Sequence, residues 1–153
     1  MTTWEVIHRP AGLLLRDADG AAIGRVLQQG NDFSFSGATA GEALHLLWAP
    51  RHWRDYHIPE LSLVAHIDFS TGILIYRALS IREIRFEWMG DAHLIRRLPF
   101  GKTECVKGDT PCMWMKSGLT RDRVTIDRVE KALRLPIALL MLAATRFEDG
   151  LPG

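Results

Sequence analysis

The sequence predicts a mainly β protein, an antiparallel β-barrel of about 10–12 short strands that encloses a buried C-terminal helix. Two observations predict this fold. Apolar and polar residues alternate with period 2 along residues 4–116, and one long helical pattern follows at residues 127–147. Because residues 137–144 are apolar on every side, that helix must be surrounded by protein or by lipid.

The alternation is clearest at residues 61–69, where every second side chain is apolar and Ser62, His66 and Asp68 lie between them. Glycine-containing turns separate such segments at residues 17–20, 36–41, 70–72 and 89–91. Glycine supplies the positive φ of tight hairpins. Many short hairpin strands indicate a barrel or a sandwich, and closure of a barrel removes exposed edges.

The helix has predicted start and stop signals. Asp127 and Glu130 match a capping box. Pro136 predicts either a kink or two consecutive helices, because its ring clashes with the carbonyl four residues earlier. Gly150 and Pro152 end the pattern.

The apolar run at residues 135–144 is too short to cross a membrane. Arg134 and Arg146 bracket it closely, whereas a bilayer span needs roughly 20 apolar residues. The sequence therefore predicts a buried helix and no transmembrane segment.

Length and composition indicate an ordinary globular protein. The 153 residues fit a single domain at residues 1–153, and 24% of them are charged. A net charge of +1 argues against a nucleic-acid partner, for which a clearly basic domain is expected. The N-terminus lacks a signal-peptide pattern, so we expect a cytoplasmic protein. The oligomeric state stays open.

Positive charge is concentrated at residues 96–123, which carry Arg96, Arg97, Lys102, Lys107, Lys116, Arg121 and Arg123 against three acidic residues. Such a block could meet an anionic partner. The other interpretation is the solvated side of two hairpins.

The two cysteines flank a turn sequence. Cys105 and Cys112 could face each other across a hairpin, where a disulfide is geometrically possible, although we expect reduced thiols in a cytosol. No further Cys or His lies at the spacing of a metal site, so no metal is expected.

The segment at residues 49–60 is the most distinctive predicted loop. Its candidate ligand-binding residues are Arg51, His52, Trp53, Arg54 and His57. Guanidinium and imidazole groups can hold a phosphate, and an aromatic ring can cover an apolar body. The alternative is a lid that seals one barrel mouth, with Trp53 and Tyr56 as plugs.

No catalytic motif is present. The chain lacks G-x-S-x-G, H-E-x-x-H, the P-loop and G-x-G-x-x-G, so we expect neither a catalytic residue nor a cofactor. The tryptophans, Trp4, Trp48, Trp53, Trp88 and Trp114, are expected mostly in the core.

The C-terminal region carries a resemblance to a known family. The residues concerned are Asp127, Val129, Ala132, Leu133, residues 137–144 and residues 147–149, together with the hairpin at residues 14–28. This pattern resembles the tubby C-terminal-like superfamily, and more narrowly the phospholipid scramblase and LURP-one-related proteins. The resemblance implies a barrel of approximately twelve strands around a hydrophobic helix, and a role in binding membrane lipids or in regulation rather than in hydrolysis.

Two functions are therefore considered. The first is a non-enzymatic binding or interaction module that recognises an anionic membrane surface or a protein partner through the 49–60 segment and Arg96, Arg97 and Lys102. The alternative is a small-molecule-binding or enzymatic β-barrel with a site near His52, Arg54 and His57. A helix that fills the interior argues against the alternative.

Overall fold

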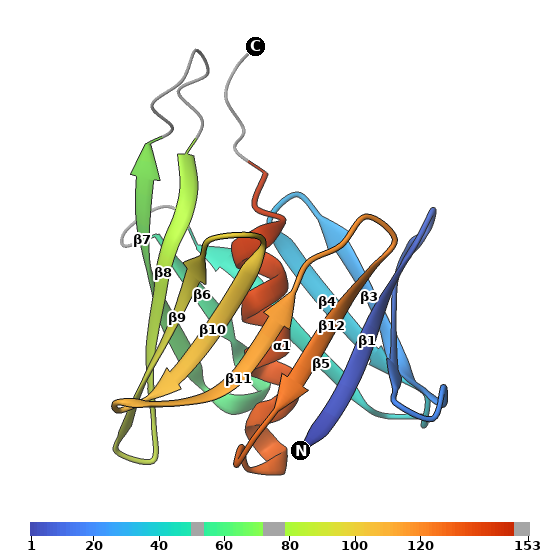
Figure 1. The fold of residues 1–153 in the computed structure, drawn as a ribbon. Coiled ribbons are helices and arrows are strands. Elements are labelled where there is room, and N and C mark those ends of the chain that lie inside the picture. Colours follow the sequence, from blue (N-terminus) through green and yellow to red (C-terminus); the bar gives the residue numbers. More distant parts are fainter. Residues whose placement is uncertain (50–53, 72–78, 149–153) are drawn as a thin grey trace.

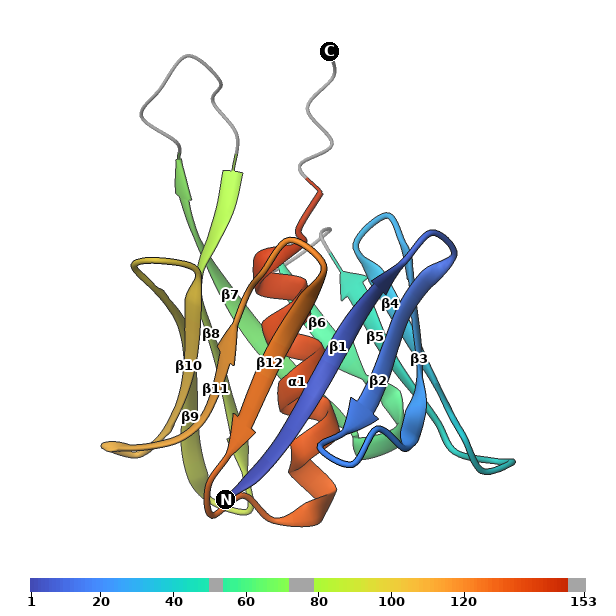
Figure 2. The ribbon, with the colours of Figure 1, turned by 45° about the vertical axis from the view of Figure 1, so that its right-hand side comes forward.

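The computed structural model describes residues 1–49, 54–71 and 79–148. Within these ranges twelve strands form a closed antiparallel barrel, and one helix, α1 (Lys131–Thr145), runs through its middle (Figures 1 and 2). The strands are β1 (Thr2–Arg9), β2 (Gly12–Asp17), β3 (Ala22–Gln29), β4 (Asp32–Gly37), β5 (Ala43–Ala49), β6 (Asp55–Ile58), β7 (Leu63–Thr71), β8 (Leu79–Trp88), β9 (Asp91–Leu98), β10 (Lys102–Lys107), β11 (Thr110–Lys116) and β12 (Arg121–Ile126).

Each strand pairs with its neighbours in the sequence, and the last strand closes on the first. Thr2 lies opposite Ile126, and Ile7 lies opposite Arg121. This closure confirms the predicted fold class. The strands extend beyond the predicted range, because β12 lies after residue 116.

The helix is enclosed as the sequence predicts. Every residue from Ile137 to Ala144 is at most 3% exposed. The inward-facing side chains of the strands, among them Phe33, Leu46, Ile84 and Met113, form one apolar cluster with it. Burial of this much apolar surface is the main favourable term in folding.

The predicted helix boundaries need correction. The helix begins at Lys131, and its N-cap residue Glu130 makes no side-chain cap hydrogen bond, so the predicted capping box is wrong. The Glu130 carboxylate instead accepts a hydrogen bond of 2.8 Å from Trp88 Nε1. Pro136 lies inside one continuous helix, so the two-helix alternative is also wrong.

The predicted loop at residues 49–60 is largely regular structure. Residues 55–58 form β6, and Pro59–Leu61 form a short 3-10 helix, η1. Tyr56 is fully buried as an inward residue of β6, so it is part of the core and not a plug of a lid. Residues 50–53 lie outside the described residues.

One further detail differs from the sequence expectation. The sequence predicts a turn at residues 70–72, but Ser70 and Thr71 belong to β7, which continues through Thr71. The strand expected at residues 73–78 lies outside the described residues. In the described part of the chain, no helix has the length and apolar character that crossing a membrane requires.

We predict that the helix contacts dominate stability. Leu140 has no exposed surface, so Leu140→Ala should lower the free energy of unfolding by about 3 kcal/mol, through lost apolar contacts and a residual cavity. Leu140→Asp should prevent folding, because it buries an unpaired charge. Urea unfolding measures both.

The matched control is Leu119→Ala, because Leu119 is fully exposed and its loss should change stability by less than about 0.5 kcal/mol. Equal effects at the two leucines would contradict an enclosed helix.

Candidate functional site

Three cations stand in a line across the outer face of three adjacent strands. Lys102 of β10 lies opposite Lys116 of β11, and Lys116 lies opposite Arg123 of β12. We call these three residues the cationic row. Like charges directly across neighbouring strands repel one another, so the row is a local cost to stability that a bound anion would remove.

The cationic row has few compensating contacts. Lys116 Nζ donates a hydrogen bond to the carbonyl of Phe100. Among the described residues, no carboxylate lies within ion-pair distance of any of the three side chains. Their positive charge is therefore available to a ligand.

An aromatic side chain lies beside the row. Trp114 is opposite Thr125 on the same outer face, and a hollow of about 520 Å³ is lined by Met1, Lys102, Trp114, Met115, Lys116, Arg123 and Thr125. Cations bind an anionic group, and an indole face covers an apolar body. The hollow thus combines the two kinds of contact that an amphipathic anion needs.

Trp114 corrects one sequence expectation. Met113 and Met115 occupy the inward positions of β11 and are fully buried, so Trp114 between them faces outward and is half-buried. Trp4, Trp48 and Trp88 pack against the core as expected. Trp53 lies outside the described residues.

The rest of the predicted basic block does not form one patch. Arg96 binds Glu104, with 3.1 Å between Arg96 Nε and Glu104 Oε2. Lys107 lies 3.4 Å from Asp91. Arg97 is exposed on β9, opposite Thr103. Of the predicted site residues Arg96, Arg97 and Lys102, only Lys102 belongs to the cationic row.

Positive charge continues onto β1 and β2. The Glu5 carboxylate lies 3.2 Å from Arg16 and 3.1 Å from Arg121. The hydrogen bond from Arg16, with that from Arg121, holds the pKa of Glu5 below its ordinary value. Two guanidinium groups on one carboxylate leave this region with excess positive charge.

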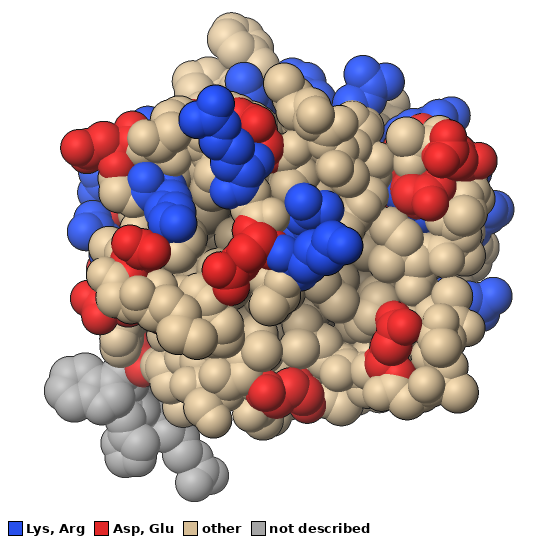
Figure 3. Space-filling model, turned by 90° about the horizontal axis from the view of Figure 1, so that it is seen from below, with Lys and Arg blue, Asp and Glu red and all other residues tan. Residues whose placement is uncertain are grey.

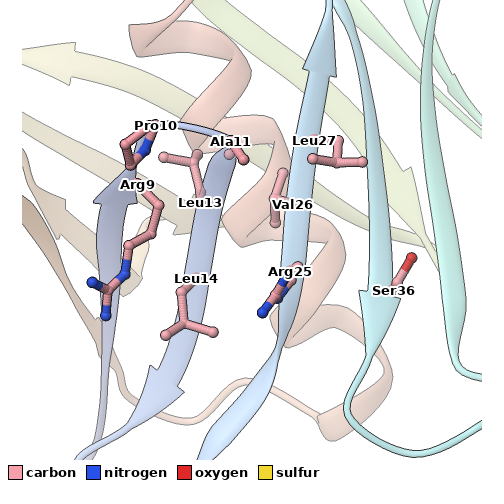
Figure 4. Close-up of a pocket in the computed structure, with 10 residues that line it drawn as sticks. Arg9, Pro10, Ala11, Leu13, Leu14, Arg25, Val26, Leu27 and Ser36 are labelled. Carbon is pink, nitrogen blue, oxygen red and sulfur yellow. The ribbon is translucent and has the colours of Figure 1, made fainter.

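A second hollow, which the sequence analysis missed, lies beyond it on the outer face of β2 and β3. It measures about 590 Å³, and we call it the Arg9–Arg25 groove. Figure 4 shows the two arginine side chains on either side of Leu14. Leu27, which is 49% exposed, also lines it. The lining holds no carboxylate, and in the described part of the chain neither arginine has an ion-pair partner within reach.

Gly12 determines the shape of the Arg9–Arg25 groove. It has φ +144°, and a Cβ atom there would lie 2.8 Å from Leu27 Cδ2 and 2.9 Å from the Val26 carbonyl oxygen. Only glycine lets β2 approach β3 this closely with such a backbone.

Of the predicted site residues of the 49–60 segment, the structure describes Arg54 and His57. Arg54 has φ 56°, and its guanidinium lies 5.4 Å from the centroid of the Phe69 ring. His57 is exposed on the outer face of β6, opposite Val64. Arg51, His52 and Trp53 lie outside the described residues.

An aromatic cluster fills the barrel mouth beside Arg54. Trp48 lies 5.1 Å from Tyr56, 5.9 Å from Phe69 and 5.3 Å from Phe147, measured between ring centroids. Phe147 follows α1, so this cluster joins the strands to the end of the helix. The position of Arg54 over Phe69 is a cation–π contact with this cluster.

Other polar groups on the outer surface are paired locally. His66 Nδ1 lies 2.9 Å from Asp55, and His45 Nδ1 lies 2.9 Å from Glu60. Among the described residues, no group of three or more His, Cys, Asp or Glu side chains could hold a metal ion. Seen from below, basic and acidic side chains are interspersed (Figure 3), so this end of the barrel presents no surface of a single sign.

Comparison with known proteins gives no assignment. No protein-family model, curated protein or solved structure matches this chain.

We predict that Gly12→Ala destabilises the protein by about 2–3 kcal/mol, because the new methyl group meets Leu27 and Val26 at a backbone conformation that alanine rarely adopts. Urea unfolding measures this. Gly20→Ala is the control, since Gly20 also has positive φ (+87°) but nothing within 4 Å, and it should cost about 1 kcal/mol. Equal losses would show that the close approach of β2 and β3 is unimportant.

Proposed function

We propose that this barrel is a non-enzymatic binding module that docks on anionic lipid membranes through the outer wall of β10, β11, β12, β1, β2 and β3. The observation that carries the proposal is the cationic row, in which Lys102, Lys116 and Arg123 lie opposite one another. An anionic surface would relieve their repulsion.

The charges on the rest of this wall support docking of the barrel through it. Cations on these six strands outnumber the carboxylates, which are Glu5, Asp17, Glu104 and the inward Asp122. The outward cations are Lys102, Lys116, Arg121, Arg123, Arg9, Arg16 and Arg25. The opposite wall, β6 to β9, has no such excess, because Asp55, Asp68, Glu83, Glu87 and Asp91 balance Arg82, Arg85, Arg96 and Arg97. The barrel would therefore be steered toward a negative surface with one side first.

The apolar parts of the wall complement its charge. A Lys or Arg near an anionic membrane contributes about 1 kcal/mol, so three of them alone give weak and salt-sensitive association. Trp114 and the exposed Leu27 add surface that suits the boundary between headgroups and acyl chains. Stable membrane binding generally needs two such signals.

The resemblance to the tubby-like superfamily agrees with this proposal, since members of that group are implicated in binding membrane lipids. Membership in it stays a prediction. The other partner that these cations would suit is a protein with an acidic surface. Binding to vesicles that contain only lipid distinguishes a membrane from such a protein.

The test is co-sedimentation of the protein with vesicles of phosphatidylcholine, with and without phosphatidylserine. Binding is expected only with the anionic lipid. Arg123→Glu removes one cation and adds one acid, so it should weaken binding by about 2 kcal/mol, or roughly 30-fold. High salt should weaken it further.

The matched control is Arg82→Glu, an equal change of charge at an exposed position on β8. It should reduce binding far less than Arg123→Glu. Equal binding to both vesicle types, or equal losses in the two variants, would reject docking through this wall.

A further inference from the structure

A β-bulge turns the second cysteine toward the first. Cys105 pairs with Met113, and Val106 pairs with Pro111, so the register shifts and leaves Cys112 as an extra residue of β11. Strict alternation would point Cys112 outward, because Met113 is an inward residue. A bulge re-aims a side chain in this way, and both Cys112 and Met113 are buried.

The Cys112 thiol therefore lies against the backbone of Cys105. Cys112 Sγ lies 3.4 Å from the carbonyl oxygen of Cys105 and is oriented to donate to it. Both cysteines are free thiols, with exposed fractions of 0% for Cys105 and 5% for Cys112.

The surroundings of the pair are asymmetric. Cys112, but not Cys105, lines two adjoining hollows of about 390 and 160 Å³, whose walls also carry Lys107 and Arg128. Arg128 has φ 55°, an uncommon backbone conformation for a residue other than glycine. Cys112 is thus the thiol with a route to solvent, and charged residues of both signs line that route, Lys107 and Arg128 together with Asp91 and Glu130.

Lys107 favours the charged form of the accessible thiol, whereas burial and Asp127 oppose it. The hydrogen bond from Cys105, together with the positive charge of Lys107, lowers the pKa of Cys112. The same hydrogen bond and burial raise the pKa of Cys105. A thiolate is the nucleophilic form of cysteine, so the two sulfurs have different expected roles.

We propose that Cys105 and Cys112 are a redox-active dithiol, which a hydroperoxide converts to an intramolecular disulfide. The Cys112 thiolate attacks one peroxide oxygen, the O–O bond breaks, and the leaving oxygen takes a proton. Cys112 is then a sulfenic acid. The Cys105 thiol loses its proton and attacks the Cys112 sulfur, the S–O bond breaks, and hydroxide leaves with that proton as water.

The disulfide would act next to the start of the helix. The Asp127 amide donates a hydrogen bond of 2.8 Å to the Cys112 carbonyl, which ties β11 to the segment that precedes α1. Oxidation would cross-link β10 and β11 at this point. Through the hydrogen bond between Asp127 and Cys112, the disulfide would restrain the segment that precedes α1.

The test treats the full-length native protein with hydrogen peroxide, followed by trypsin without a reductant. Cleavage after Lys102, Lys107 and Lys116 places the cysteines on separate peptides, 103–107 and 108–116. A disulfide joins these peptides with a loss of about 2 Da, the mass of two hydrogen atoms. Methionine oxidation adds mass and joins nothing, so it does not interfere.

The expected result after peroxide is the joined peptide as the main product. Before peroxide, the reduced protein should bind one phenylarsine oxide, a reagent that requires two neighbouring thiols. Dimedone, which captures sulfenic acids, should label Cys105→Ser after peroxide treatment and leave Cys112→Ser unlabelled. Cys105→Ala replaces the first variant if serine prevents folding. Absence of the joined peptide from the wild-type protein would overturn the proposal, and equal labelling of the two variants would overturn the role of Cys112.

Discussion

The enclosure of an entirely apolar helix is the constraint on which the rest of this structure depends. A helix without a polar face is stable only when side chains surround it on every side, and the inward residues of the twelve strands do so. The wall must therefore close, which β1 and β12 achieve. Among the described residues, the buried Asp122 brings a charge to the edge of this interior, where it lies 3.1 Å from His8 and 3.8 Å from Arg146, the residue that follows α1.

Because α1 fills the interior, the outer wall is the surface that this barrel offers to a ligand. Lipocalin-type barrels hold a ligand inside, but here α1 occupies that space. Outward side chains are free of the packing constraint, so their charges can be arranged for a partner. The cationic row and the Arg9–Arg25 groove are two arrangements of outward charge, and both depend on register. A curved wall with an apolar groove and excess positive charge suits a soft, anionic surface better than a small rigid ligand.

Much of the fold could be predicted from the sequence, because period-2 alternation and an all-apolar helix are local signals. What could not be predicted depends on neighbours. β12 was missed because charged residues occupy half of its positions, including the inward Asp122. β6 has four residues and becomes a strand only through its pairing with β5 and β7. The predicted capping role of Glu130 is lost to Trp88, which is distant in sequence. The cationic row was visible as basic residues, but their alignment required the register.

Where a strand departs from inward–outward alternation, one side chain can contact both the core and the outer surface of the barrel. In a regular strand every second side chain belongs to the helix and the others to solvent, so chemistry on one face is isolated from the other. Bulges break this rule at Leu15/Arg16, at Asp68/Phe69 and at Cys105/Val106. Only at the last of these, within the described strands, does a nucleophilic side chain reach both the core and a surface hollow. The bulge that interrupts the pairing of β10 and β11 thus places Cys112 beside Cys105 in the core and next to a hollow at the surface.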